Sequence, residues 1–406
     1  MRTLQQPSDR KYRKTHAWLT FELDLRGAGP GLWIALGEAS SKCEHIAGVP
    51  LQPAVRDRLH QLYLAKGVRA TTAIEGNTLS EDEVLQRVAG KRTLPPSREY
   101  LGQEVDNVSA AVNEIATRFV EGQDLVLTPD QIRNYNRLVL RDLELRREVV
   151  PGQIRTYPAV VGRYHGAPAQ DCEFLLQELC GWLSQPEWVP GMHPIADGLL
   201  KAIVAHLYIA CIHPFGDGNG RTARLVEFQI LVSAGTPTPA AHLLSNFYNE
   251  TREEYYRQLD KATEPRVGVL RFIEYALRGF VDGLREQLRT IQDQQLSITW
   301  RDYVHAHFQD DATLAAKRRR DLVLDLSARP EPVPRDQIRS VSPRIAEAYG
   351  GKTGRTVSRD LNALVRMDLI ERVPEGFRPK TDAILAFLPL RQVPKRPSGA
   401  PSDNAG

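Results

Sequence analysis

The feature that most constrains this chain is a twelve-residue stretch, "HPFGDGNGRTAR", which runs from His213 to Arg224. It directly follows the apolar run "KAIVAHLYIACI" and precedes "RLVEFQILVSAG". Both flanks have the length and apolar content of buried helices, whereas the stretch between them is polar and rich in glycine. The sequence therefore predicts two core helices joined by a loop that has a purpose other than packing.

The backbone of this loop suits an anion. The segment "GNG" opens a helix, so its N–H groups have no partner within the helix, and the helix dipole favours negative charge there. Arg221 and Arg224 lie three residues apart on one helical face and suit phosphate oxygens. Asp217 is a hard ligand for Mg²⁺, and His213 is the loop's only group that titrates near neutrality. A surface turn with solvated arginines is the alternative, which the full combination disfavours.

At every specified position the loop matches the signature HPFx(D/E)GNGRxxR, and the chain thereby resembles the Fic family. The resemblance implies transfer of AMP from ATP to a Ser, Thr or Tyr hydroxyl of a protein, self-modification included. His213 would be the catalytic base, and Asp217 would hold Mg²⁺ (or Mn²⁺). The nucleotide phosphates would contact Gly218, Asn219, Gly220, Arg221 and Arg224.

A second motif, "TTAIEG" at residues 71–76, resembles the family's inhibitory pattern (S/T)xxxE(G/N). The resemblance implies autoinhibition in which Glu75 pairs with Arg224 and occupies the space of the ATP γ-phosphate. The alternative is an ordinary helix end with Gly76 as its C-terminal glycine.

Two further segments resemble parts of the same site. "IRTYPAVVGRYHGAPA" resembles a β-hairpin flap that docks the target as an added strand, with Val160, Val161 and Gly162 as the candidate edge. "NFYNETREEYYRQL" resembles the segment that closes the adenine pocket, with Asn249, Tyr255 and Tyr256 as candidate nucleotide contacts. An ordinary hairpin and core aromatic residues are the alternatives.

The C-terminal part is more basic than the rest, with 18 lysines and arginines against 11 acids from Lys317 onward, although the whole chain carries a net charge of only +3. Its pattern looks like a winged helix-turn-helix with a recognition helix over residues 356–367. Leu361, Leu364 and Val365 are expected to pack. The candidate DNA contacts are Arg355, Ser358, Arg359 and Asn362. A protein-binding or dimerisation role is the alternative.

The four cysteines show no CxxC pair or metal-ligand spacing, so we expect buried thiols. No signal segment or run of about eighteen apolar residues is present, which predicts a cytoplasmic protein without a membrane partner. Fic relatives often form dimers, so a homodimer is expected.

We expect a mainly α protein with a helical Fic core, a β-hairpin flap and a C-terminal winged helix domain. The expected parts are an irregular lead-in at 1–40, a helical region with the inhibitory motif at 41–125, a Fic core at 126–300, a winged helix at 301–385 and a disordered tail at 386–406. The pattern leaves open the reverse hydrolysis of AMP–protein bonds, transfer of another phosphate-containing group, or a nucleotide-sensing DNA-binding regulator.

Overall fold

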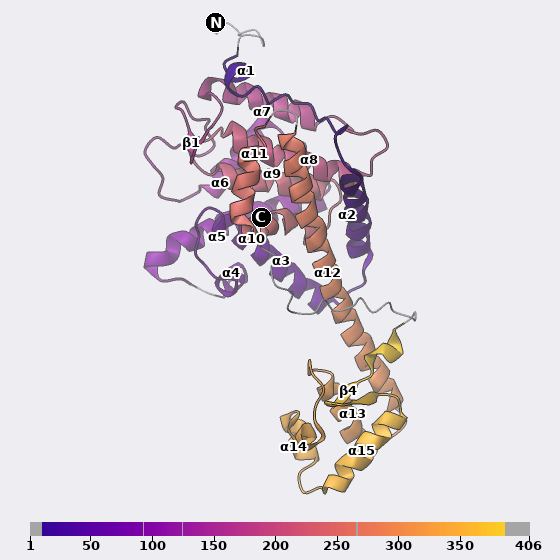
Figure 1. The fold of residues 1–406 in the computed structure, drawn as a ribbon. Coiled ribbons are helices and arrows are strands. Elements are labelled where there is room, and N and C mark those ends of the chain that lie inside the picture. Colours follow the sequence, from indigo (N-terminus) through magenta and orange to yellow (C-terminus); the bar gives the residue numbers. More distant parts are fainter. Residues whose placement is uncertain (1–9, 92, 124, 265–266, 386–406) are drawn as a thin grey trace, which may run out of the picture. The chain divides into compact units, whose positions relative to one another are not determined.

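The computed structural model describes residues 10–91, 93–123, 125–264 and 267–385 (Figure 1). The chain divides into two compact units, residues 1–289 and 290–406. The whole predicted tail, residues 386–406, and the first nine residues lie outside the described part.

The protein is mainly α-helical, as predicted. The first unit contains α1 Tyr12–Thr15, α2 Pro30–Gly48, α3 Pro53–Ala73, α4 Glu81–Val88, α5 Glu99–Val120, α6 Pro129–Val139, β1 Val160–Val161, β2 Tyr164–His165, α7 Ala169–Leu183, α8 Pro194–Ile212, α9 Asn219–Ser233, α10 Leu243–Glu250 and α11 Arg252–Lys261. The helix α12 Gly268–His307 begins in the first unit and ends in the second. The second unit continues with α13 Leu314–Leu326, α14 Pro343–Ala348, α15 Gly354–Arg366, β3 Ile370–Val373 and β4 Gly376–Pro379. Short 3₁₀ helices are η2 Pro96–Arg98, η3 Ala240–His242, η4 Arg335–Ser340 and η5 Thr381–Ile384.

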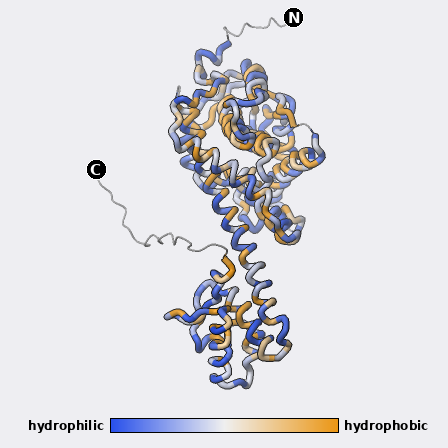
Figure 2. The backbone as a smooth tube through the Cα atoms, turned by 90° about the vertical axis from the view of Figure 1, so that its right-hand side faces the viewer, coloured by the Kyte–Doolittle hydropathy of each residue, from blue (hydrophilic) through white to orange (hydrophobic). Residues whose placement is uncertain are grey.

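The helix pair α8 and α9 forms the centre of the first unit, with α2, α3, α5, α6 and α7 packed around it. Among the described residues, α8 alone is long and apolar enough to cross a membrane, yet 94% of that window is buried inside the unit. The outer helices mix hydrophobic and hydrophilic residues along their length (Figure 2). The loop between α8 and α9 therefore connects two helices in the most buried part of the first unit.

Side-chain caps mark the starts of two helices. Ser80 and Glu83 form a capping box at the start of α4, and the Thr128 hydroxyl accepts a hydrogen bond from the Gln131 N–H at the start of α6. The irregular lead-in at 1–40 was wrong in its second part, because α2 begins at Pro30. Glycines within α2 weaken the helical pattern, but burial of Leu32, Leu36 and Cys43 offsets their cost.

The second unit begins at Thr290, within α12, rather than at residue 301. The reason is that Trp300, Val304 and Phe308 of α12 belong to this unit's hydrophobic core. Three helices then precede an antiparallel hairpin in which Ile370 pairs with Pro379. This order agrees with the winged helix prediction, which stays a prediction.

A buried carboxylate holds α15 in place. Asp360 is fully buried and accepts hydrogen bonds from Arg318 at 2.8 Å, Arg319 at 2.9 Å and the Tyr349 hydroxyl at 3.2 Å. Val365 was expected to pack but is 37% exposed, because the buried stripe of α15 runs through Val357, Leu361 and Leu364. Of the candidate DNA contacts, Arg355, Arg359 and Asn362 are exposed, whereas Ser358 is partly buried.

Candidate active site

Two residues with left-handed backbone conformation and the Asn219 side chain determine the shape of the loop between α8 and α9. His213 ends α8 in the left-handed region with φ of 51°, and Gly218, with φ of 73°, precedes α9. The Asn219 side chain accepts from the Phe215 N–H and donates to the Phe215 carbonyl, both at 2.9 Å. Asn219 was predicted to stabilise phosphate charge; here it also closes the loop, while its amide nitrogen carries a second N–H.

His213 is prepared to accept a proton. Its Nδ1 lies 3.3 Å from the Ala210 carbonyl, which can only accept, so Nδ1 carries the hydrogen and Nε2 the free lone pair. Burial lowers the pKa of His213 below 6.5, and the nearby Arg155 charge lowers the pKa further, against the hydrogen bond to Ala210. The imidazole is therefore neutral at pH 7, as a general base must be.

Arg155, which the sequence reasoning missed, ties the hairpin segment to this histidine. The buried guanidinium donates to the carbonyls of His213 at 2.7 Å and Tyr157 at 2.6 Å, and also to Ala167. The backbone N–H of Arg155 bonds the Pro214 carbonyl at 3.0 Å. No local pattern marks this arginine, because its partners are backbone groups, and those of His213 and Pro214 are distant in sequence.

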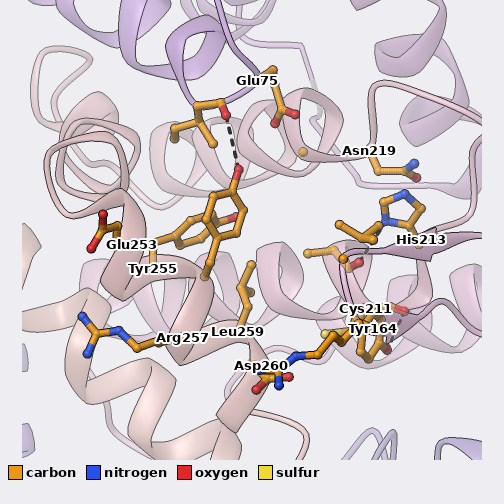
Figure 3. A pocket seen from close by; sticks show the side chains of 17 residues that line it. Glu75, Tyr164, Cys211, His213, Asn219, Glu253, Tyr255, Arg257, Leu259 and Asp260 are labelled. Atoms are coloured by element: carbon orange, nitrogen blue, oxygen red, sulfur yellow. Dashed lines mark hydrogen bonds between the residues drawn. The ribbon is translucent and has the colours of Figure 1, made fainter.

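A cavity of about 530 Å³ opens beside the loop. Its wall includes the end of α3, the hairpin, the end of α8 and α11. Figure 3 shows His213 and Asn219 together on one side, across from Glu253, Tyr255 and Arg257, with Glu75 reaching in from a third side. The predicted base and the predicted inhibitory residue thus face one space.

Glu75 contacts Arg224 as predicted. The Glu75 Oε1 lies 2.5 Å from Arg224 Nη2, which also donates to the Thr71 carbonyl at 2.9 Å. A Cβ added at Gly220 would lie 2.2 Å from this same carboxylate oxygen, so the glycine leaves the room that Glu75 occupies. Desolvation would raise the pKa of Glu75, but Arg224 and Arg221 hold it below 4.5, so the carboxylate is ionised.

Arg221, the other arginine of the loop, is also paired with carboxylates. Arg221 Nη1 lies 3.5 Å from Glu104 Oε1 and its Nη2 lies 3.3 Å from Asp217 Oδ1. Asn77, just beyond the inhibitory motif, donates to Glu104 at 2.8 Å. Glu104 is a second residue that the sequence reasoning missed, since it lies on an amphipathic helix far from the loop.

The loop offers one candidate metal ligand, Asp217. Its side chain is 45% exposed, and the described residues contain no group of three or more His, Cys, Asp or Glu side chains suited to a metal. A single carboxylate fits Mg²⁺, which usually keeps several waters and binds substrate phosphates as well. Asp217 would hold the ion, which would neutralise phosphate charge.

The predicted flap is a short β-hairpin. Val160 pairs with His165 and Val161 with Tyr164, and the two valines are 56% and 45% exposed. Gly162 was placed on the edge strand but lies in the two-residue turn with φ of 59°. The positive φ at the first turn position is typical of a type II′ turn.

The three candidate adenine contacts do not line one cavity. Tyr255 and Tyr256 line the cavity, but Asn249 lines another one with Lys66 and Arg69 of α3. The separation arises because α10 ends at Glu250 and α11 begins at Arg252, so Asn249 and the tyrosines belong to different helices. Tyr255 is 2% exposed and its hydroxyl lies 2.9 Å from His206 Nε2.

Residues 126–231, which include the whole loop and the hairpin, match the model of the Fic/DOC family. The chain carries a Fic domain. The hairpin, His213 and the loop arginines described above all lie within it, whereas Glu75 precedes it.

Curated relatives that match this chain are named adenylyltransferases. The chain is 29% identical over 226 residues to "Protein adenylyltransferase fic-1" of Caenorhabditis elegans, which covers 55% of this chain and 41% of the relative. It is 28% identical over 194 residues to "Protein adenylyltransferase Fic" of Culex quinquefasciatus, and the match covers 48% of this chain and 36% of the relative. The chain thus spans about two fifths of the length of such relatives.

Solved structures show the same fold. A Fic family protein from Desulfovibrio desulfuricans matches with a TM-score of 0.52 and 23% identity over 86% of this chain and 96% of that one. A fragment of Fic-1 from Caenorhabditis elegans matches with a TM-score of 0.52 and 24% identity, over 65% and 73%.

Proposed function

We propose that this protein is an autoinhibited protein adenylyltransferase that transfers AMP from ATP to a hydroxyl of a protein, with self-modification included. The observation that carries the proposal is that His213 lines the same cavity as Asn219 and Gly220, the first residues of α9. The names of the curated relatives support the same reaction.

In the proposed reaction, a target hydroxyl loses its proton to His213 Nε2 while its oxygen attacks the α-phosphorus of ATP. The new O–P bond forms as the bond between the α-phosphorus and the bridging oxygen breaks, and pyrophosphate leaves. The start of α9 and the loop arginines stabilise the charge that develops on the phosphate oxygens. Val160 and Val161 would hold the target backbone beside the base.

The reaction is tested by the position of a radioactive label. The Glu75→Gly variant with Mg²⁺ and α-labelled ATP should retain label on protein, whereas γ-labelled ATP should leave none. Incubation with a separately AMP-modified protein tests the reverse hydrolysis. Retention of γ-label would assign the protein to a different phosphate transfer, and release of AMP alone would assign it to the reverse reaction.

The pH dependence of transfer follows from the state of His213. The base acts only when neutral, and burial lowers the pKa of His213 below 6.5. Activity should therefore persist as the pH falls through 6.5, and should be lost only at lower pH, where His213 becomes protonated. Glu75 raises the His213 pKa, and its removal should extend activity further toward acid. The measurement is kcat/KM of the Glu75→Gly variant between pH 5 and 9. An acidic limb at or above pH 6.5 would contradict the neutral base.

A second candidate function, DNA binding, rests on the exposed Arg355, Arg359 and Asn362 of α15. If α15 reads duplex DNA, affinity should fall steeply with salt, with a log–log slope of about −0.9 per phosphate contact. The Arg355→Ala, Arg359→Ala double variant should reduce that slope by about 2 if both contact phosphate. The Arg146→Ala, Arg147→Ala double variant, at two exposed positions of the first unit, is the charge-matched control. Equal binding by all three proteins would leave α15 a protein-binding element.

A further inference from the structure

The end of α3 that carries Glu75 needs hydrogen-bond donors from outside the helix, because the last carbonyls of a helix have no partner within it. Arg224 supplies one to the Thr71 carbonyl at 2.9 Å. Within the described residues, no backbone N–H bonds the Ile74 carbonyl, which instead accepts from the Tyr256 hydroxyl at 3.3 Å (dashed line, Figure 3). The inhibitory end is therefore held by α9 on one side and by α11 on the other.

Tyr256 also faces the cavity. Its side chain is 43% exposed and lines the same space as His213 and Glu75, while its hydroxyl contacts α3. Tyr255, whose ring centroid lies 5.3 Å away, differs because it is buried and bonded to His206. Of these two tyrosines, Tyr256 alone combines an exposed ring with a hydroxyl on the inhibitory segment.

Building on the proposed function, we propose that Tyr256 is a positioning residue that couples nucleobase binding to release of Glu75. In this proposal, a planar base stacks on the exposed ring and shifts it. A hydrogen bond already at 3.3 Å tolerates little displacement, so the Ile74 carbonyl loses its donor. Ile74 directly precedes Glu75, and the freed segment yields the anion site to the nucleotide phosphates.

Tyr256→Phe tests this coupling because it keeps the ring and removes the hydroxyl. In the otherwise unchanged protein, it should raise labelling from α-labelled ATP by about two- to tenfold, the effect of one net hydrogen bond. In the Glu75→Gly background, the same change should give no gain, because the Glu75 contact that it would release is already absent. An equal loss of activity in both backgrounds, no change in either, or a gain that persists without Glu75 would each overturn the coupling.

Amide hydrogen exchange tests the coupling without any chemical turnover, so it still decides if AMP transfer itself is absent. Without nucleotide, Tyr256→Phe should speed exchange over residues 75–77, whereas Tyr100→Phe, at an exposed tyrosine of α5, should not. ATP should speed exchange there in the unchanged protein and add little in Tyr256→Phe. Unchanged exchange in Tyr256→Phe would contradict the inference even if transfer were observed.

Discussion

Replacing His213 by alanine should lower the rate of AMP transfer by about 10²- to 10⁴-fold, the usual contribution of a general base. The reason is that Nε2 of His213 is the group placed to take the proton of the target hydroxyl, since Nδ1 is committed to the Ala210 carbonyl. The loop backbone and both arginines remain, so nucleotide binding should change little. Turnover is measured with labelled ATP in the Glu75→Gly background, and binding by calorimetry.

His45→Ala is the matched control for this experiment, because His45 is an exposed histidine on α2. It should match the parent protein in both measurements. Transfer that survives in His213→Ala would assign the proton to another group, and lost nucleotide binding would make His213 a binding residue instead.

Replacing Glu75 by glycine should raise AMP transfer by about 10- to 100-fold, which corresponds to about 1.4–2.8 kcal/mol. The Arg224 side chain is 1% exposed, so removal of its carboxylate partner leaves a buried charge that favours another anion. Glu75 follows the last residue of α3, Ala73, so glycine there should cost the helix little. Initial rates at several ATP concentrations give the measurement, and KM for ATP should fall.

One further variant separates charge from shape at this position, and another serves as a control at a different position. Glu75→Gln keeps the side-chain size and removes the charge, so it should activate less than glycine. Glu114→Gln, at an exposed carboxylate of α5, should have no effect. If Glu75→Gly were no more active than the unchanged protein, the inhibitory role would be excluded.

The parts of the site that are contiguous in sequence could be predicted residue by residue. His213 to Arg224 form one loop, and glycines, a base and arginines at fixed offsets have few other uses. The pairing of Glu75 with Arg224 joins distant segments, and it was predicted only because both ends carry motifs. The structure brings the two residues together at 2.5 Å.

The supporting residues could not be predicted, for physical reasons. Asn136 donates to the Asp217 carbonyl at 2.9 Å and accepts from the Gly152 N–H at 2.9 Å, but on sequence it is one more polar residue of an amphipathic helix. Arg155 and Glu104 act through tertiary contacts that local spacing does not encode. Asn249 does not line the same cavity as the two tyrosines for a related reason. A break of one residue between α10 and α11 places it at a different cavity.

The contact of Glu75 with Gly220 and Arg224 has a consequence for how the protein responds to its surroundings. In the proposed inhibition, Glu75 is a competing anion tethered beside its own binding site, and tethering sets a high local concentration that does not depend on solution composition. Because the tether is the end of a helix rather than a flexible linker, that local concentration depends on how firmly α3 is held. Inhibition of this kind is surmountable, so the protein should respond to nucleotide concentration with a threshold that the contacts of α3 determine.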